Sequence, residues 1–82
     1  MTLELFERAV LTRNLAAHGL RAGDVGMIVD RQPGDSARPA TYELEFFSER
    51  GETIVVVSVP AASVREATVH DLLIGRRYIR SA

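Results

Sequence analysis

The alternating run TYELEFF, residues 41–47, constrains the fold of this chain more than any other stretch. Apolar side chains occupy every second position, and the acids Glu43 and Glu45 lie between them. A period of two is that of a β-strand with one face toward a core and the other toward water. The expected core face consists of Tyr42, Leu44 and Phe46.

The residues that follow complete a hairpin. SERGE, residues 48–52, predicts a tight turn with Gly51 at the position that needs a positive φ. TIVVVSV, residues 53–59, is β-branched almost throughout, and Pro60 ends it because proline has no N–H for the ladder. Both faces of this strand are apolar, so we expect it to be central in the sheet or covered on both sides.

Three shorter patterns supply the remaining strands, although the first can also be read as a helical turn. They span residues 5–12, 25–32 and 64–68. The connector 13–20 predicts one turn of helix with Asn14 as its N-cap and Gly19 as its stop. Gly26 predicts a β-bulge or the close approach of another backbone. Residues 33–40 are a polar loop rich in Pro and Gly.

Five short strands and tight turns in 82 residues predict an all-β fold, a small five-stranded SH3-like antiparallel barrel. Closing the sheet would remove the edges that a flat sheet of this size exposes. We expect a barrel domain over residues 1–69 and a C-terminal extension over residues 70–82. The expected interior is Leu11, Val25, Ile28, Tyr42, Leu44, Phe46, Val55, Val57 and Val64.

The glycine-rich stretch GLRAGDVGMIVD, residues 19–30, raises a choice between a phosphate cradle and a turn. A Walker-type loop needs a Lys and a following helix, whereas this chain has no Lys and continues into a strand pattern. The dinucleotide fingerprint GxGxxG is also missing. We therefore interpret Gly23 and Asp24 as a turn at a barrel corner, with the Asp24 carboxylate bound to backbone N–H groups two residues on.

Taken together, these segments resemble a small bacterial family classed as a domain of unknown function (four-nine-two-six). The resemblance covers about residues 5–67 and rests on GLRAGDVGMIVD, YELEF, GETIVVVSVP and VRE. It implies an SH3-like β-barrel without a known activity. Some members lie beside genes of toxin-like proteins, which implies an antitoxin or immunity role. The glycine turn also resembles the KOW element of ribosomal and transcription proteins, and that likeness suggests nucleic-acid binding by analogy alone.

No catalytic or metal-binding set is recognisable. The chain has no Cys, which excludes disulfides, thiolate metal sites and Cys nucleophiles. The only histidines, His18 and His70, lack Asp or Glu at ligand spacing. Glu43 and Glu45 would lie about 6.5–7 Å apart along one strand, a separation that glycosidases use, but so small a domain offers little cleft. We therefore predict no enzymatic activity, no cofactor and no bound metal.

The C-terminal stretch HDLLIGRRYIRSA, residues 70–82, combines large apolar side chains with three arginines. Each large apolar side chain gains about 1.5–3 kcal/mol on full burial, so we expect the stretch to pack on the barrel or to dock on another molecule. A turn at Gly75 would divide it into two short pieces. Because Arg and Tyr are frequent interface residues, the predicted partner-binding positions are Arg76, Arg77, Tyr78, Ile79 and Arg80.

The leading hypothesis is a non-catalytic protein-binding module, whose partner is a toxin-like protein encoded nearby or a second copy of the chain. The alternative is a KOW-like nucleic-acid-binding domain, which the arginines of the tail favour and the net charge of -1 opposes. The apolar runs fall far short of the roughly 20 residues that span a bilayer. The N-terminus carries early acids and no basic leader. We therefore expect a cytoplasmic protein without membrane contact.

Overall fold

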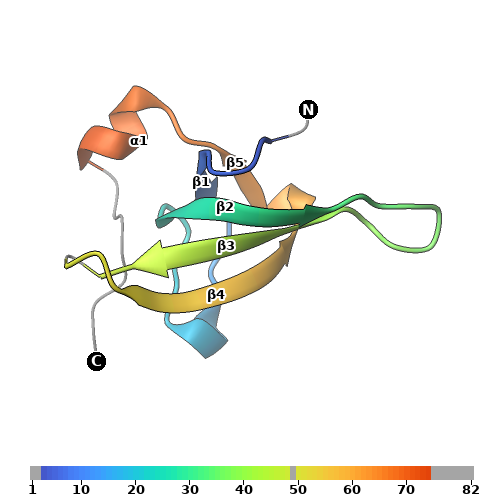
Figure 1. Cartoon of the computed structure of the whole chain (residues 1–82), viewed down its shortest axis with the longest axis horizontal. Coiled ribbons are helices and arrows are strands. Elements are labelled where there is room, and N and C mark those ends of the chain that lie inside the picture. Colours follow the sequence, from blue (N-terminus) through green and yellow to red (C-terminus); the bar gives the residue numbers. More distant parts are fainter. Residues whose placement is uncertain (1–2, 49, 75–82) are drawn as a thin grey trace.

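The computed structural model describes residues 3–48 and 50–74, and it confirms an all-β fold of five antiparallel strands (Figure 1). A short α-helix and two single turns of 3-10 helix complete it. The strands are β1 (Arg8–Leu11), β2 (Val25–Gln32), β3 (Thr41–Phe47), β4 (Thr53–Pro60) and β5 (Val64–Glu66). The helical elements are η1 (Ala16–His18), η2 (Ala61–Ser63) and α1 (Val69–Ile74).

The strands follow the order β4-β3-β2-β1-β5, and β2 is shared between two halves of the sheet. Its first residues pair with β1 and its later residues pair with β3. In Figure 1, β1 and β5 cross the directions of β2, β3 and β4 steeply. This arrangement is compatible with an SH3-like barrel. However, β4 and β5 stand at opposite ends of the order, so the described sheet is not closed by pairing between them.

The expected interior is confirmed. Eight of its nine residues are buried, and Val55 is partly buried against the same cluster. The alternation of β3 is reproduced, with every second side chain buried from Tyr42 to Phe46. In β1, by contrast, alternation fails because Ala9, Val10 and Leu11 are all buried in a strand that lies between β2 and β5.

The first strand also begins later than the sequence predicts. Phe6 has a φ of 67°, a left-handed conformation that bulky residues rarely adopt. Its N–H donates to the carbonyl of Ile28 at 2.6 Å, and the N–H of Ile28 donates to the carbonyl of Glu7 at 3.0 Å. Residues 5 and 6 therefore form a turn beside β2, and the strand begins only at Arg8.

The predicted bulge at Gly26 is wrong, because Gly26 pairs regularly with Ala9 and the register shift lies between Ile28 and Asp30. The close approach predicted at the same glycine is real. A Cβ atom placed on Gly26 would lie 2.9 Å from the ring of Phe46 and 3.1 Å from the carbonyl oxygen of Glu45. A glycine is needed here for space, since Phe46 fills the core directly above it.

The connector before β2 differs from the prediction in its polar contacts. Gly19 ends η1 in the left-handed region, as expected, but the N-cap is Leu15 and has no side-chain cap bond. Asn14 instead accepts a hydrogen bond from the N–H of Ala22 at 2.9 Å. The buried Asp24 accepts from the N–H of Arg21 at 2.9 Å, three residues before it. Both side chains thus fasten the turn that leads into β2.

The expectation that residues 53–59 form a central or doubly covered strand is wrong for the described chain. β4 is an end strand whose ladder partner is β3. Its inward residues Val57 and Val59 are buried, whereas Ile54 and Val56 on the other face are exposed. Apolarity on both faces indicated burial, but only one face meets the core.

The loop 33–40 lies at one end of the long axis, and α1 lies toward the other (Figure 1).

Candidate protein-binding surfaces

The outer face of β4 presents apolar side chains to water. Val56 is 47% exposed and Ile54 is 37% exposed. Val56 stands opposite Glu45 of β3. The hydroxyl of Thr53 donates a hydrogen bond to the Glu45 carboxylate, which fixes that acid beside the strand. The face therefore has an apolar rim on β4 and an acidic row on β3.

The free side of β4 lacks most devices that protect edge strands. Natural edges carry Lys, Pro, inward-pointing charges or bulges, because an unpaired row of N–H and C=O groups invites another strand. From Thr53 to Val59 there is no charged residue and no Pro. The one irregularity is a register shift opposite Phe46 and Phe47, near the start of the strand.

The second surface is α1, which begins at a capping box. The hydroxyl oxygen of Thr68 accepts from the N–H of Asp71 at 3.2 Å, and the Asp71 carboxylate accepts from the N–H of Thr68 at 2.7 Å. This reciprocal pattern satisfies two backbone donors at the helix start. A six-residue helix is too short to be stable by itself in water, so these contacts help to define it.

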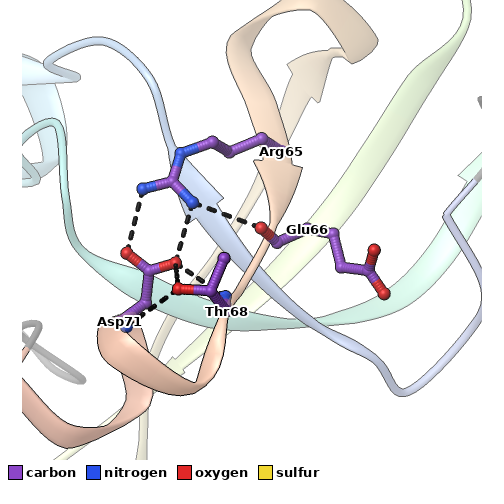
Figure 2. Close-up of polar contacts among 4 residues, drawn as sticks. All are labelled: Arg65, Glu66, Thr68 and Asp71. Atoms are coloured by element: carbon purple, nitrogen blue, oxygen red, sulfur yellow. Dashed lines mark hydrogen bonds and ion pairs between the residues drawn. The ribbon is translucent and has the colours of Figure 1, made fainter.

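An ion pair fastens the same helix to β5. Arg65 donates from Nη1 to Oδ2 of Asp71 at 2.8 Å and from Nη2 to Oδ1 at 2.9 Å, a two-pronged arrangement (Figure 2). Nη1 also donates to the carbonyl oxygen of Glu66 at 3.2 Å. We call Arg65, Thr68 and Asp71 the α1 joint.

The charges of the α1 joint reinforce one another. Hydrogen bonding from Arg65, together with the backbone N–H of Thr68, holds the pKa of the Asp71 carboxyl far below its ordinary value. The same hydrogen bond raises the pKa of the Arg65 guanidinium. Asp71 is therefore ionised at any physiological pH, and the joint persists across that range.

The α1 joint leaves an apolar pair facing outward. Val69 is 73% exposed and Leu73 is 76% exposed. They are four residues apart, so they lie on one face of the helix. Leu72, between them in sequence, is half-buried. The helix thus turns two large apolar side chains to water in a fixed orientation.

The predicted partner-binding residues follow α1 directly. Arg76, Arg77, Tyr78, Ile79 and Arg80 lie outside the described residues, as does the predicted turn at Gly75. The division into a domain over 1–69 and an extension over 70–82 stays a prediction. α1 is the described beginning of that extension, and its start is set by the α1 joint.

The histidines and the paired glutamates that the sequence singled out do not form a site among the described residues. His18 and His70 are both exposed, and within residues 3–48 and 50–74 no three His, Asp or Glu side chains are grouped to hold a metal ion. Glu43 and Glu45 are half-buried on the outer face of β3 rather than fully solvated. A pocket of about 490 Å³ lies at the base of the loop 33–40, beside Arg31 and Tyr42.

Sequence reasoning missed the α1 joint. The spacing of Thr68 and Asp71 matches the T-x-x-D form of a capping box, so the start of α1 had a readable signal. The ion pair had no such signal, because Arg65 lies in a strand and nothing in the spacing places it against Asp71, six residues later. The left-handed Phe6, 68% exposed, likewise had no signal in the sequence.

Comparisons with known proteins place the chain in one family. A family model described as a domain of unknown function (DUF4926) matches residues 5–66. No curated protein matches the chain significantly, and no solved structure does. Among the described residues, no helix has the length and apolar character needed to cross a membrane.

Proposed function

The chain belongs to the family of the domain of unknown function DUF4926, and we propose that it is a non-catalytic protein-binding module. The observation that carries this proposal is α1, a short helix fastened by the α1 joint with Val69 and Leu73 turned outward. The match assigns no activity to the family, so the proposal depends on this geometry.

The joint makes the apolar pair a ready-made docking element. A helix that is already ordered loses less conformational freedom on binding than a segment that must fold first. Residues at i and i+4 of one helix are the contacts that an apolar groove on a partner receives. The expected partner surface is therefore an apolar groove into which Val69 and Leu73 insert.

The arm that continues from α1 would extend the same contact. Arg76, Arg77 and Arg80 give it positive charge, and Tyr78 and Ile79 give it apolar surface. A groove with an acidic rim would suit this composition. The bacterial family resemblance favours a toxin-like protein encoded beside this gene as the partner, with this chain as its antitoxin or immunity protein in the cytoplasm.

Charge favours a protein partner over nucleic acid. The chain carries a net charge of -1, and the exposed side of the sheet includes Glu43 and Glu45. A nucleic-acid-binding face is basic and interleaved with aromatic side chains. The KOW-like alternative therefore depends on the glycine turn and on the arginines of the tail.

The direct test is titration calorimetry with the purified toxin-like protein encoded next to this gene. We expect Leu73→Asp to weaken binding at least tenfold, about 1.4 kcal/mol, because a charge would enter the apolar groove. The matched control is Ala37→Asp, which places the same charge on the exposed loop 33–40 and should leave affinity unchanged. Equal affinity of Leu73→Asp and the wild type would contradict the proposal.

A second arm separates the nucleic-acid alternative. Fluorescence anisotropy with duplex DNA at low salt should detect no binding. Detectable binding would replace the proposal with the KOW-like function if the logarithm of the association constant falls with the logarithm of the salt concentration. The expected slope is about -0.9 for each phosphate contact.

A further inference from the structure

We propose that β4 is a self-association strand, so that two copies of this chain pair their β4 strands antiparallel about a two-fold axis at Val56. The two sheets would then form one continuous sheet across the dimer. This surface shares no residue with α1, so the inference stands apart from the function proposed above.

In the part of the chain that the structure describes, the edge of β4 away from β3 pairs with no other strand. Seven consecutive residues, 53–59, carry neither charge nor Pro. An edge of this length and composition accepts a further strand readily, and proteins usually prevent that with charges or Pro.

The sequence of β4 fits its own two-fold copy. An axis at Val56 places Val56 opposite Val56, Val55 opposite Val57 of the second copy, and Thr53 opposite Val59. The regular part of this pairing spans residues 55–57 of both copies, and residues 58 and 59 meet the irregular start of the other strand. Pro60, which has no N–H to donate, lies beyond the pairing. The register shift near Ile54 lies away from the axis, where it leaves Val55 to Val59 in regular register with β3.

Exposure also favours a second copy. Val56, 47% exposed, points away from the core, and in this pairing its counterpart covers it. Cross-strand pairs of β-branched side chains are favourable contacts in antiparallel sheets. A two-fold axis brings identical residues together, and an uncharged strand can meet itself without like-charge repulsion.

The acids next to the edge do not oppose this arrangement. Glu45 stands opposite Val56 on β3, so the two copies of Glu45 would be separated by three strand spacings. At about 4.8 Å per spacing this is roughly 14 Å, beyond the screening length of about 8 Å at physiological salt. An incoming strand with its own acids on this face would stand only two spacings from Glu45.

The first test is the mass in solution, measured by sedimentation equilibrium over a concentration series. The monomer has a mass of 9.0 kDa, so a dimer has twice that, about 18 kDa. We expect the wild type to reach the dimer mass, and Val56→Lys to weaken dimerisation by at least about 100-fold, because two ammonium groups would meet at the axis. The control Ala37→Lys, on the exposed loop 33–40, should dimerise like the wild type.

The second test does not depend on disrupting the strand. The chain has no Cys, so Val56→Cys introduces a single thiol. Directly opposed residues in an antiparallel pair have Cα atoms about 4.5–5.5 Å apart, which suits a disulfide. We expect mild oxidation to link Val56→Cys into a dimer at concentrations where Ala37→Cys, on the exposed loop 33–40, stays unlinked.

The outcomes separate the two proposals. A wild type that stays at 9.0 kDa at every concentration, or equal cross-linking of both cysteine variants, would overturn self-association through β4. Neither result would affect binding of a partner at α1, because Val56 lies on a different element. A monomer whose Val56→Lys variant loses the toxin-like partner would instead assign β4 to that protein.

Discussion

β4 and α1 are both peripheral segments with exposed apolar side chains, yet they are held in place by different forces. β4 is fixed by a full ladder with β3 and by burial of Val57 and Val59. α1 is fixed by the α1 joint, a capping box and one two-pronged ion pair. Burial is indifferent to pH, whereas the joint requires an ionised Asp71. The position of β4 therefore does not depend on pH, whereas the position of α1 depends on a cap and an ion pair that both need the Asp71 carboxylate.

The largest expected effect lies beneath β4. Leu44 is fully buried and stands opposite Val57, so Leu44→Ala would leave a cavity under both strands. We expect a loss of about 2–5 kcal/mol in the free energy of unfolding, measured by urea denaturation. At concentrations where the chain is monomeric, Val56→Ala, on the exposed face of the same pair of strands, should change it by no more than about 0.5 kcal/mol. Similar losses from both variants would show that the outer face of β4 is as buried as the core.

A smaller loss of stability is expected where Gly26 lies against Phe46 in the core. Gly26→Val would push a side chain into the ring of Phe46, since even a Cβ atom would lie 2.9 Å from it. We expect a loss of about 1–3 kcal/mol from overpacking, measured by thermal melting. Adding Phe46→Leu to Gly26→Val should recover part of that loss. If the double variant is less stable than additivity predicts, the two side chains are not in conflict.

A smaller and more local effect is expected at the α1 joint. Arg65→Gln removes the charge that faces Asp71. We expect the amides of α1 to exchange faster with deuterium while the melting temperature of the sheet is unchanged. The Arg65 side chain is 49% exposed, and an ion pair open to solvent on one side contributes little to global stability. The amide exchange rate of α1 in Arg65→Lys should fall between the rates in the wild type and in Arg65→Gln, since Lys keeps the charge but cannot make the two-pronged contact. Protection of α1 that survives Arg65→Gln would show that the helix is held by other contacts.

The smallest effect is the response of α1 to acid. The pKa of Asp71 is lowered by folding, so its contribution is complete above its ordinary pKa of 3.8 and is lost as the pH falls toward the folded value. We expect the amide proton of Thr68, which bonds to Asp71, to titrate in NMR spectra well below pH 3.8. The resonances of β4 should not follow this titration. A midpoint near 3.8 for Thr68 would mean that the pair with Arg65 does not form in solution.

Much of the sheet could be predicted because its signals are local. The alternation of residues 41–47, the positive φ of Gly51 and the bounds of β2 all come from neighbouring residues. The environment of β4 could not be predicted in this way. Apolar residues on both faces of β4 predict that both faces are covered. They do not indicate whether this chain or another molecule covers them.

The α1 surface was only half predictable for a related reason. The expectation of an ordered segment after residue 69 came from its apolar content, and the T-x-x-D spacing could have placed the helix start. The pairing of Arg65 with Asp71 depends on where the chain turns after β5, which no local pattern encodes. Gly26 shows the same limit. The glycine itself predicted a close approach at that position, but no local pattern identified Phe46 as the neighbour.

If the α1 joint positions a docking helix, the affinity for the toxin-like partner must fall when the joint is broken by Arg65→Gln. Arg65 lies on β5 and reaches α1 through its pair with Asp71. We expect titration calorimetry to show weaker binding by Arg65→Gln than by the wild type, with the affinity of Ala37→Asp unchanged and the sheet equally stable in all three proteins. Wild-type affinity in Arg65→Gln, together with loss of protection in α1, would contradict it.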